Sequence, residues 1–194
     1  MENMELRPQD VVVVLKLLAR GGTPWSYSML GEELAMSASH VFASVNRAQA
    51  SRLLDFAAIP PRPRPVRVAR PSRNRLATLP KPNRSNLKEF LIHGVKYAFP
   101  VERGGPTRGI PTAEATSPLK QQFPQDFPLP PVWPYAEGSV RGIEFSPLYK
   151  NVPAAALRDP KLHELLALVD AIREGRARER EIAIRELTAR IDAQ

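Results

Sequence analysis

Positive charge is concentrated in one short segment of this chain. Residues 57–103 contain 11 lysines and arginines but two carboxylates, whereas residues 1–56 contain five basic and six acidic side chains. Six of the arginines alternate with proline and small residues, with no carboxylate among them: Arg62, Arg64, Arg67, Arg70, Arg73 and Arg75. Clustered cations neutralise phosphates and release the counterions that condense on a nucleic acid. The cluster therefore predicts a phosphate-binding arm; the alternative is a solvated linker without a ligand.

A second group of residues has the spacing of two helices that cross through a short turn. In the run from Met29 to Val45, Gly31 is small enough for close helix contact, and Ser37 is placed to cap the second helix. Apolar side chains recur where a shared core needs them: Leu30, Leu34, Met36, Val41 and Val45. This pattern predicts a helix-turn-helix.

The run resembles the helix-turn-helix of winged, MarR-type bacterial transcription regulators over residues 7–56. Two features depart from that pattern. Ala35 stands where the turn usually has glycine, and the basic proline-rich segment follows where two wing strands are expected. The resemblance implies that the second helix enters the major groove of double-stranded DNA. It places these residues at the DNA: Ser37, Ala38, Ser39, Phe42, Ala43, Asn46 and Arg47, with His40 at the flank.

Three of these side chains have the chemistry to read particular bases. Asn46 can pair with adenine, Arg47 with guanine or a phosphate, and Phe42 can contact a thymine methyl group. Phe42 has an alternative role, which is packing against another part of the protein or a second subunit. Because the helix face carries little charge, the arginines after Pro60 must supply the phosphate contacts, in the manner of a minor-groove arm.

Residues that support catalysis or metal binding are scattered. The chain has no cysteine, and His40, His93 and His163 fall in three separate predicted helices without the spacing of metal ligands. Glu164 and Asp170 are expected at solvated helix positions, not as an acid pair. We therefore expect a protein without enzymatic activity, cofactor or metal ion.

The segment from Tyr97 to Thr112 is dense in glycine and other turn formers. Such a loop can cradle an anion with its backbone amides, but it lacks the Gly-Lys-Ser/Thr ending of a phosphate loop. We expect a structural loop. Together with the C-terminal helices, this stretch looks like regulators that are encoded beside nucleotidyltransferase-type toxins.

The periodicity of apolar residues predicts the elements that position these groups. The predicted helices are 7–20, two within 25–56, 83–93, 159–173 and a last one ending near Ile191; short strands are predicted at 95–99 and 142–145. The fold class is mainly α, with an N-terminal (winged) helix-turn-helix, a proline-rich irregular middle with a few short strands, and a C-terminal helical hairpin. The predicted domains are a DNA-binding domain over 1–56, a basic linker or arm over 57–82, and an α+β or helical domain over 83–194.

These features favour a cytoplasmic, sequence-specific transcription regulator that binds double-stranded DNA. The apolar stripe through Leu162, Leu166 and Val169 either forms a homodimer interface or packs into the core. An antitoxin-like protein that binds a partner from its own operon and represses that operon is the alternative, followed by an RNA-binding protein. The longest apolar run, Val11–Leu15, is too short to cross a bilayer, so no membrane association is expected.

Overall fold

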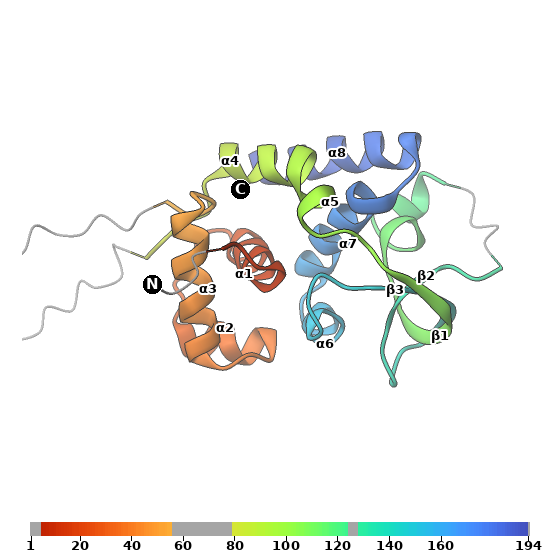
Figure 1. Ribbon diagram of the computed structural model, residues 1–194, viewed down its shortest axis with the longest axis horizontal. Helices are drawn as coiled ribbons and strands as arrows, with labels where there is room; N and C mark the ends of the chain where they lie inside the picture. The colour runs from red at the N-terminus through yellow and green to blue at the C-terminus, as the bar shows by residue number, and fades with distance from the viewer. Residues whose placement is uncertain (1–4, 56–78, 124–127, 194) are drawn as a thin grey trace, which may run out of the picture.

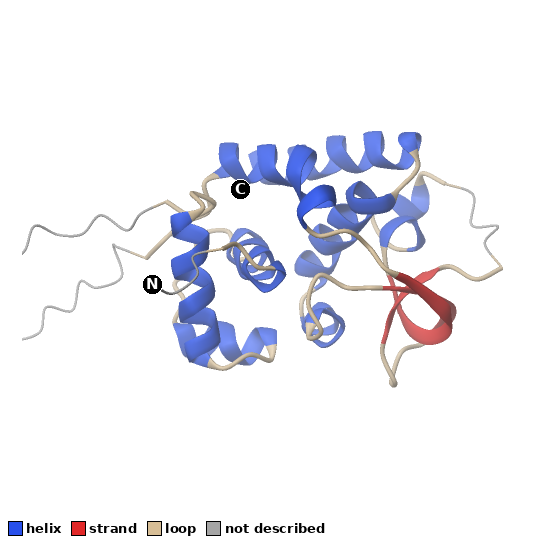
Figure 2. Cartoon of the chain, viewed as in Figure 1, coloured by secondary structure: helices blue, strands red, loops and turns tan. Residues whose placement is uncertain are grey.

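The computed structural model describes residues 5–55, 79–123 and 128–193. Within them the chain is mainly helical, with a small three-stranded sheet and a C-terminal pair of helices (Figures 1 and 2). The mainly α class is confirmed at this level. The six arginines of the basic segment lie outside the described residues. Among the described helices, none has the length and apolar character needed to span a bilayer.

Three helices form the N-terminal part: α1 (Pro8–Ala19), α2 (Tyr27–Leu34) and α3 (Ala38–Ala50). Pro8 suits the first position of α1, where a backbone N–H would lack a helical partner. The turn after α1 is made by Gly21 and Gly22, which both have positive φ. Residues 10–19 of α1 are all buried, so this helix is packed on all sides, between α3 and the C-terminal helices (Figure 1).

A second helical stretch follows the predicted basic linker or arm over residues 57–82. It consists of α4 (Arg84–Glu89), a π-helical turn (Phe90–Gly94) and α5 (Val95–Ala98). The strand predicted at 95–99 is wrong. Leu87, Leu91 and Val95 are fully buried and four residues apart, so the apolar stripe of the helix continues through Gly94, while Tyr97 is 77% exposed.

The sheet contains β1 (Arg103–Pro111), β2 (Pro131–Pro134) and β3 (Val140–Phe145). β1 is antiparallel to both other strands, and β2 and β3 are parallel, so the three strands close on one another. A Cβ atom at Gly109 would lie 2.0 Å from the carbonyl oxygen of Trp133, which explains why this close approach requires glycine. The strand predicted at 142–145 is confirmed, whereas the predicted loop over 97–112 contains β1.

The C-terminal helices are α6 (Val152–Arg158), α7 (Pro160–Glu174) and α8 (Ala177–Asp192). The predicted helical hairpin is confirmed by α7 and α8. The stripe through Leu162, Leu166 and Val169 is buried in the core of the same chain. One hydrophobic cluster runs from α1 to α8, so the described N-terminal and C-terminal helices share a core.

Asp170 on α7 is buried, with 1% of its surface exposed, so the solvated position expected for it is wrong. Its Oδ2 accepts hydrogen bonds from the hydroxyl of Thr112 at 2.8 Å and the indole N–H of Trp133 at 2.7 Å, while Arg173 donates to Oδ1 at 2.8 Å. Burial raises the pKa of Asp170, and the three donors act in the opposite direction. These bonds fix the sheet to α7. Glu164 is partly exposed and accepts a hydrogen bond from Ser117.

A buried lysine joins α1, α2 and α7. Nζ of Lys16 lies 2.7 Å from Oδ2 of Asp159 and 2.8 Å from Oε2 of Glu33, and Lys16 itself is 5% exposed. Asp159 also caps α7 by accepting hydrogen bonds from the amides of Lys161 and Leu162. Burial alone raises the pKa of Asp159. The hydrogen bond and charge of Lys16, together with the two amide hydrogen bonds, outweigh burial and hold the pKa below its usual 3.8.

The substitution Asp159→Asn tests this junction, because asparagine retains the cap but loses the charge. We expect a loss of about 1–3 kcal/mol in the free energy of unfolding at pH 7, measured with urea. Because the pKa of Asp159 is lower in the folded protein than in the unfolded chain, its charged form stabilises the folded state. This stabilisation is fully present above the usual pKa of the carboxyl and is lost as the pH falls through the pKa of the folded protein. The difference between the proteins should therefore shrink towards pH 3.

Asp192→Asn is the matched control, because Asp192 forms an exposed ion pair with Lys88 at 2.8 Å. This change should alter the free energy of unfolding by less than about 0.5 kcal/mol. Equal effects of the two substitutions at pH 7 would contradict a stabilising role for the buried junction.

Candidate nucleic-acid interface

The turn between α2 and α3 is built from three residues, 35–37. Ala35 adopts the left-handed conformation, with φ of 52°, at the position where the resembled pattern usually has glycine. The backbone N–H of Met36 donates to the carbonyl of Gly31 at 2.8 Å, and a Cβ atom at Gly31 would lie 2.7 Å from the carbonyl oxygen of Met36. Gly31 is therefore required for the close approach that the sequence predicted.

Serine side chains cap the N-terminal ends of α2 and α3. Ser26 accepts a hydrogen bond from the amide of Met29 at the start of α2, and Ser37 accepts one from the amide of His40 at the start of α3; both are 3.2 Å long. The cap predicted at Ser37 is confirmed. These bonds satisfy amides that have no partner within the helix and so fix where each helix begins.

One face of α3 is buried and the opposite face is open to solvent. The buried face consists of Val41, Ser44, Val45 and Ala48. The predicted contact residues that are exposed are Ser37, Ala38, Ser39, His40, Phe42 and Asn46. Ala43 is half-buried. These side chains are therefore accessible to a ligand, and their binding to DNA stays a prediction.

Arg47 differs from the other residues of this set. Its Nε and Nη2 atoms donate to the two carboxylate oxygens of Asp10 at 2.8 and 2.7 Å. Asp10 is fully buried and also accepts a hydrogen bond from the backbone amide of Arg7. The guanidinium therefore ties α3 to the first turn of α1 with the bidentate geometry that reading a guanine would use. We assign Arg47 a structural role.

Phe42 combines the two roles weighed for it. Its ring makes an edge-to-face contact with Tyr27, with ring centroids 5.3 Å apart, and Tyr27 makes a similar contact with the buried Trp25. Half of the Phe42 surface nevertheless remains exposed. The aromatic contacts restrict the ring while leaving its outer edge available to a ligand.

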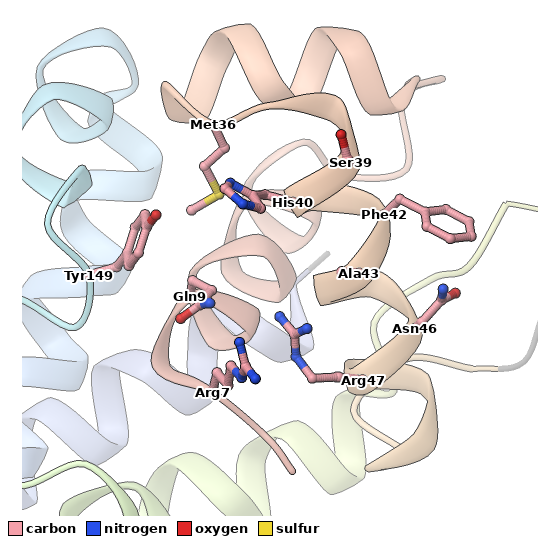
Figure 3. A pocket seen from close by; sticks show the side chains of 10 residues that line it. All are labelled: Arg7, Gln9, Met36, Ser39, His40, Phe42, Ala43, Asn46, Arg47 and Tyr149. Carbon is pink, nitrogen blue, oxygen red and sulfur yellow. The ribbon is translucent and has the colours of Figure 1, made fainter. Parts of the chain in front are cut away.

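A cavity of about 460 Å³ lies beside this surface, between α3, the start of α1 and the segment before α6. Its lining residues are Arg7, Gln9, Met36, Ser39, His40, Phe42, Ala43, Asn46, Arg47 and Tyr149. Figure 3 shows that Phe42 and Asn46 point to one side of α3, whereas Met36, His40 and Gln9 lie on the side that faces Tyr149. The lining contains no carboxylate and two arginines, of which Arg47 is already paired with Asp10 and Arg7 is the other cation.

Both ends of the basic segment leave the described structure next to α3. Leu54 and Pro82 form an antiparallel bridge, and the amide of Asp55 donates to the carbonyl of Lys81 at 2.8 Å. Exposed cations surround this bridge, namely Arg52, Lys81 and Arg84. None of the three forms an ion pair with a described residue. Residues 56–78, between the two sides of this bridge, lie outside the described structure, and so does most of the segment where wing strands were expected.

The C-terminal part of the chain contacts the turn from outside. The side-chain amide of Asn151 donates to the carbonyl of Ala35, and Nη1 of Arg158 donates to the carbonyl of Glu32 at 2.8 Å. Sequence reasoning missed these residues and also Arg7, Gln9 and Tyr149. They come from segments far from α3 in the sequence, and no local pattern identifies them.

Arg47→Leu tests the structural role of the ion pair. Because the substitution leaves the carboxylate of Asp10 buried without its charged partner, we expect a loss of about 3–5 kcal/mol in the free energy of unfolding. Arg190→Leu is the control, since Arg190 forms partly exposed pairs with Glu164 and Glu186; its cost should stay below about 1 kcal/mol. The double variant Asp10→Leu, Arg47→Leu should recover part of the loss. Urea unfolding that leaves Arg47→Leu as stable as the control would show that the pair does not hold α3.

Comparison with known proteins places this interface in no established family. No family model matches the sequence, and neither the curated proteins nor the solved structures contain a match. The function of the α3 surface has therefore to be argued from its own geometry and chemistry.

Proposed function

We propose that the protein binds double-stranded DNA sequence-selectively through the exposed face of α3 and acts as a non-enzymatic transcription regulator. The observation that carries this proposal is the arrangement of α3 itself. It is a 13-residue helix whose core side is buried and whose outer side presents hydrogen-bonding groups and one restrained aromatic ring. The major groove of B-form DNA is wide enough to admit such a helix.

The roles of individual residues follow from their chemistry. The side-chain amide of Asn46 is suited to pair with an adenine, and the exposed edge of Phe42 to contact a thymine methyl group. Ser39 and His40 lie in the first turn of α3, where the helix dipole favours a phosphate. Arg7 lines the same cavity as these two residues and adds a cation there.

The α3 face alone is short of positive charge, because Arg47 is paired with Asp10. The remaining phosphate contacts are assigned to Arg52, Lys81 and Arg84 and to the arginines between residues 62 and 75. Both ends of that basic segment start beside the C-terminal end of α3, which supports a contact with the same duplex.

Asn46→Ala and Phe42→Ala test the reading surface. We expect each to weaken binding to the duplex from upstream of the protein's own gene about ten- to a hundredfold, since a good base contact contributes about 1–3 kcal/mol. Binding to a scrambled duplex should be nearly unchanged, because phosphate contacts carry no sequence information. Fluorescence anisotropy of labelled duplexes measures both affinities.

Tyr97→Ala and Gln121→Ala serve as controls, because these exposed residues lie on other elements. They should leave both affinities unchanged. Equal losses on the two duplexes after Asn46→Ala would contradict base reading by α3. Tighter binding to RNA of the same sequence would favour an RNA-binding protein, and no binding to any nucleic acid would favour a partner protein.

Replacing the six arginines between residues 62 and 75 with glutamine tests the source of the phosphate contacts. The logarithm of the affinity falls linearly with the logarithm of the salt concentration, with a slope of about 0.9 per phosphate contact. We expect a flatter slope between about 50 and 200 mM salt, with the preference for the upstream duplex retained. An unchanged slope would show that the segment is a linker.

A further inference from the structure

Two exposed arginines face each other on the sheet. Arg108 of β1 and Arg141 of β3 are direct partners in the antiparallel register. Directly opposite side chains on such strands leave the same face of the sheet, with Cβ atoms about 4.5–5.5 Å apart. Like charges at this spacing repel each other and destabilise the pair of strands. The pair of arginines therefore lowers the stability of the sheet.

A third arginine, Arg103 of β1, has partners within the protein. Nε of Arg103 donates to Glu174 at 2.8 Å, and its guanidinium lies 4.8 Å from the ring centre of Phe145. Arg108 and Arg141 have neither an ion pair nor a ring contact within the described part of the chain. Glu137 and Glu144 are close in sequence to Arg141, but neither forms an ion pair with Arg108 or Arg141.

We propose that Arg108 and Arg141 together form a phosphate-binding clamp. A guanidinium binds phosphate oxygens through two parallel N–H donors, and two arginine side chains that leave neighbouring strands on the same face have the reach to bind the non-bridging oxygens of one phosphate. A phosphate between them removes the repulsion. No carboxylate has to be displaced from either arginine before the anion binds.

The ligand of the clamp is a phosphodiester of the nucleic-acid backbone, and this assignment rests on the proposed function. The sheet lies at the opposite end of the molecule from α3, with α1 and α7 between them (Figure 1). The clamp therefore contacts a different stretch of backbone from the one beside α3. Because it touches phosphate only, its contribution is the same for every duplex sequence.

The double variant Arg108→Gln, Arg141→Gln tests the clamp in the full-length protein. Anisotropy with the upstream duplex and with a scrambled duplex of equal length is measured between about 50 and 200 mM salt. One phosphate contact carries a slope of about 0.9, so we expect the slope to fall by about one for both duplexes alike. At the lowest salt concentration the affinity for both should fall at least fivefold.

The matched control is Arg178→Gln, Arg185→Gln, which removes the same charge from two exposed positions on α8. Its slope should equal that of the wild-type protein. In the absence of nucleic acid, the clamp variant should have a urea midpoint equal to or above that of the wild type, because repulsion has been removed. A lower midpoint would mean that the arginines stabilise the sheet, which would overturn the proposal.

The outcomes separate this proposal from the function assigned to α3. A reduced slope for the clamp variant on both duplexes supports the clamp even if Asn46→Ala has no effect, in which case base reading by α3 is wrong. An unchanged slope overturns the clamp even if Asn46→Ala abolishes sequence preference. A wild-type protein that binds no duplex overturns both.

Discussion

The bidentate ion pair between Arg47 and Asp10 sets the orientation of α3 against α1. Asp10 is fully buried, so its charge needs this partner, and the two parallel hydrogen bonds leave little rotational freedom between the helices. Val41, Val45 and Ala48 complete the contact with apolar surface. With these residues fixed inward, the helical period places Ser39, Phe42 and Asn46 outward. The ion pair between Arg47 and Asp10 thus helps to determine which residues of α3 face the solvent.

The helix that receives this ion pair is shared by both halves of the chain. α1 contacts α3 through Asp10 and α7 through Lys16, six residues later, where Asp159 caps α7. The carbonyls of Glu32 and Ala35 are bound by residues from the segment around α6. The segment around α6 therefore holds the turn that precedes α3 from outside.

The helices of the fold could be predicted because their signals are local. Capping serines, glycine pairs and apolar stripes identify α1 to α3 and the α7–α8 hairpin within windows of a few residues. The strand expected at 95–99 is a helix because the alternating pattern there competes with apolar residues spaced four apart from Leu87 onward. Burial of these residues in the core favours the helix. β1 was hidden by its glycines and prolines, although Gly109 is required there by the close approach of β2. Asp170 and Arg47 have ordinary surface sequences, and only their distant partners determine that they are buried or paired.

The exposed residues on the outer side of α3 were the part of the candidate site easiest to predict from sequence, because the helical period alone determines which residues face outward. A titration of isotope-labelled protein with the upstream duplex, followed by amide chemical shifts, tests their role most directly. We expect the largest shifts at residues 37–46, further shifts near Arg52 and Lys81, and smaller shifts at all of these positions for a scrambled duplex. Shifts of equal size with both duplexes, or shifts that leave α3 unaffected, would contradict this role.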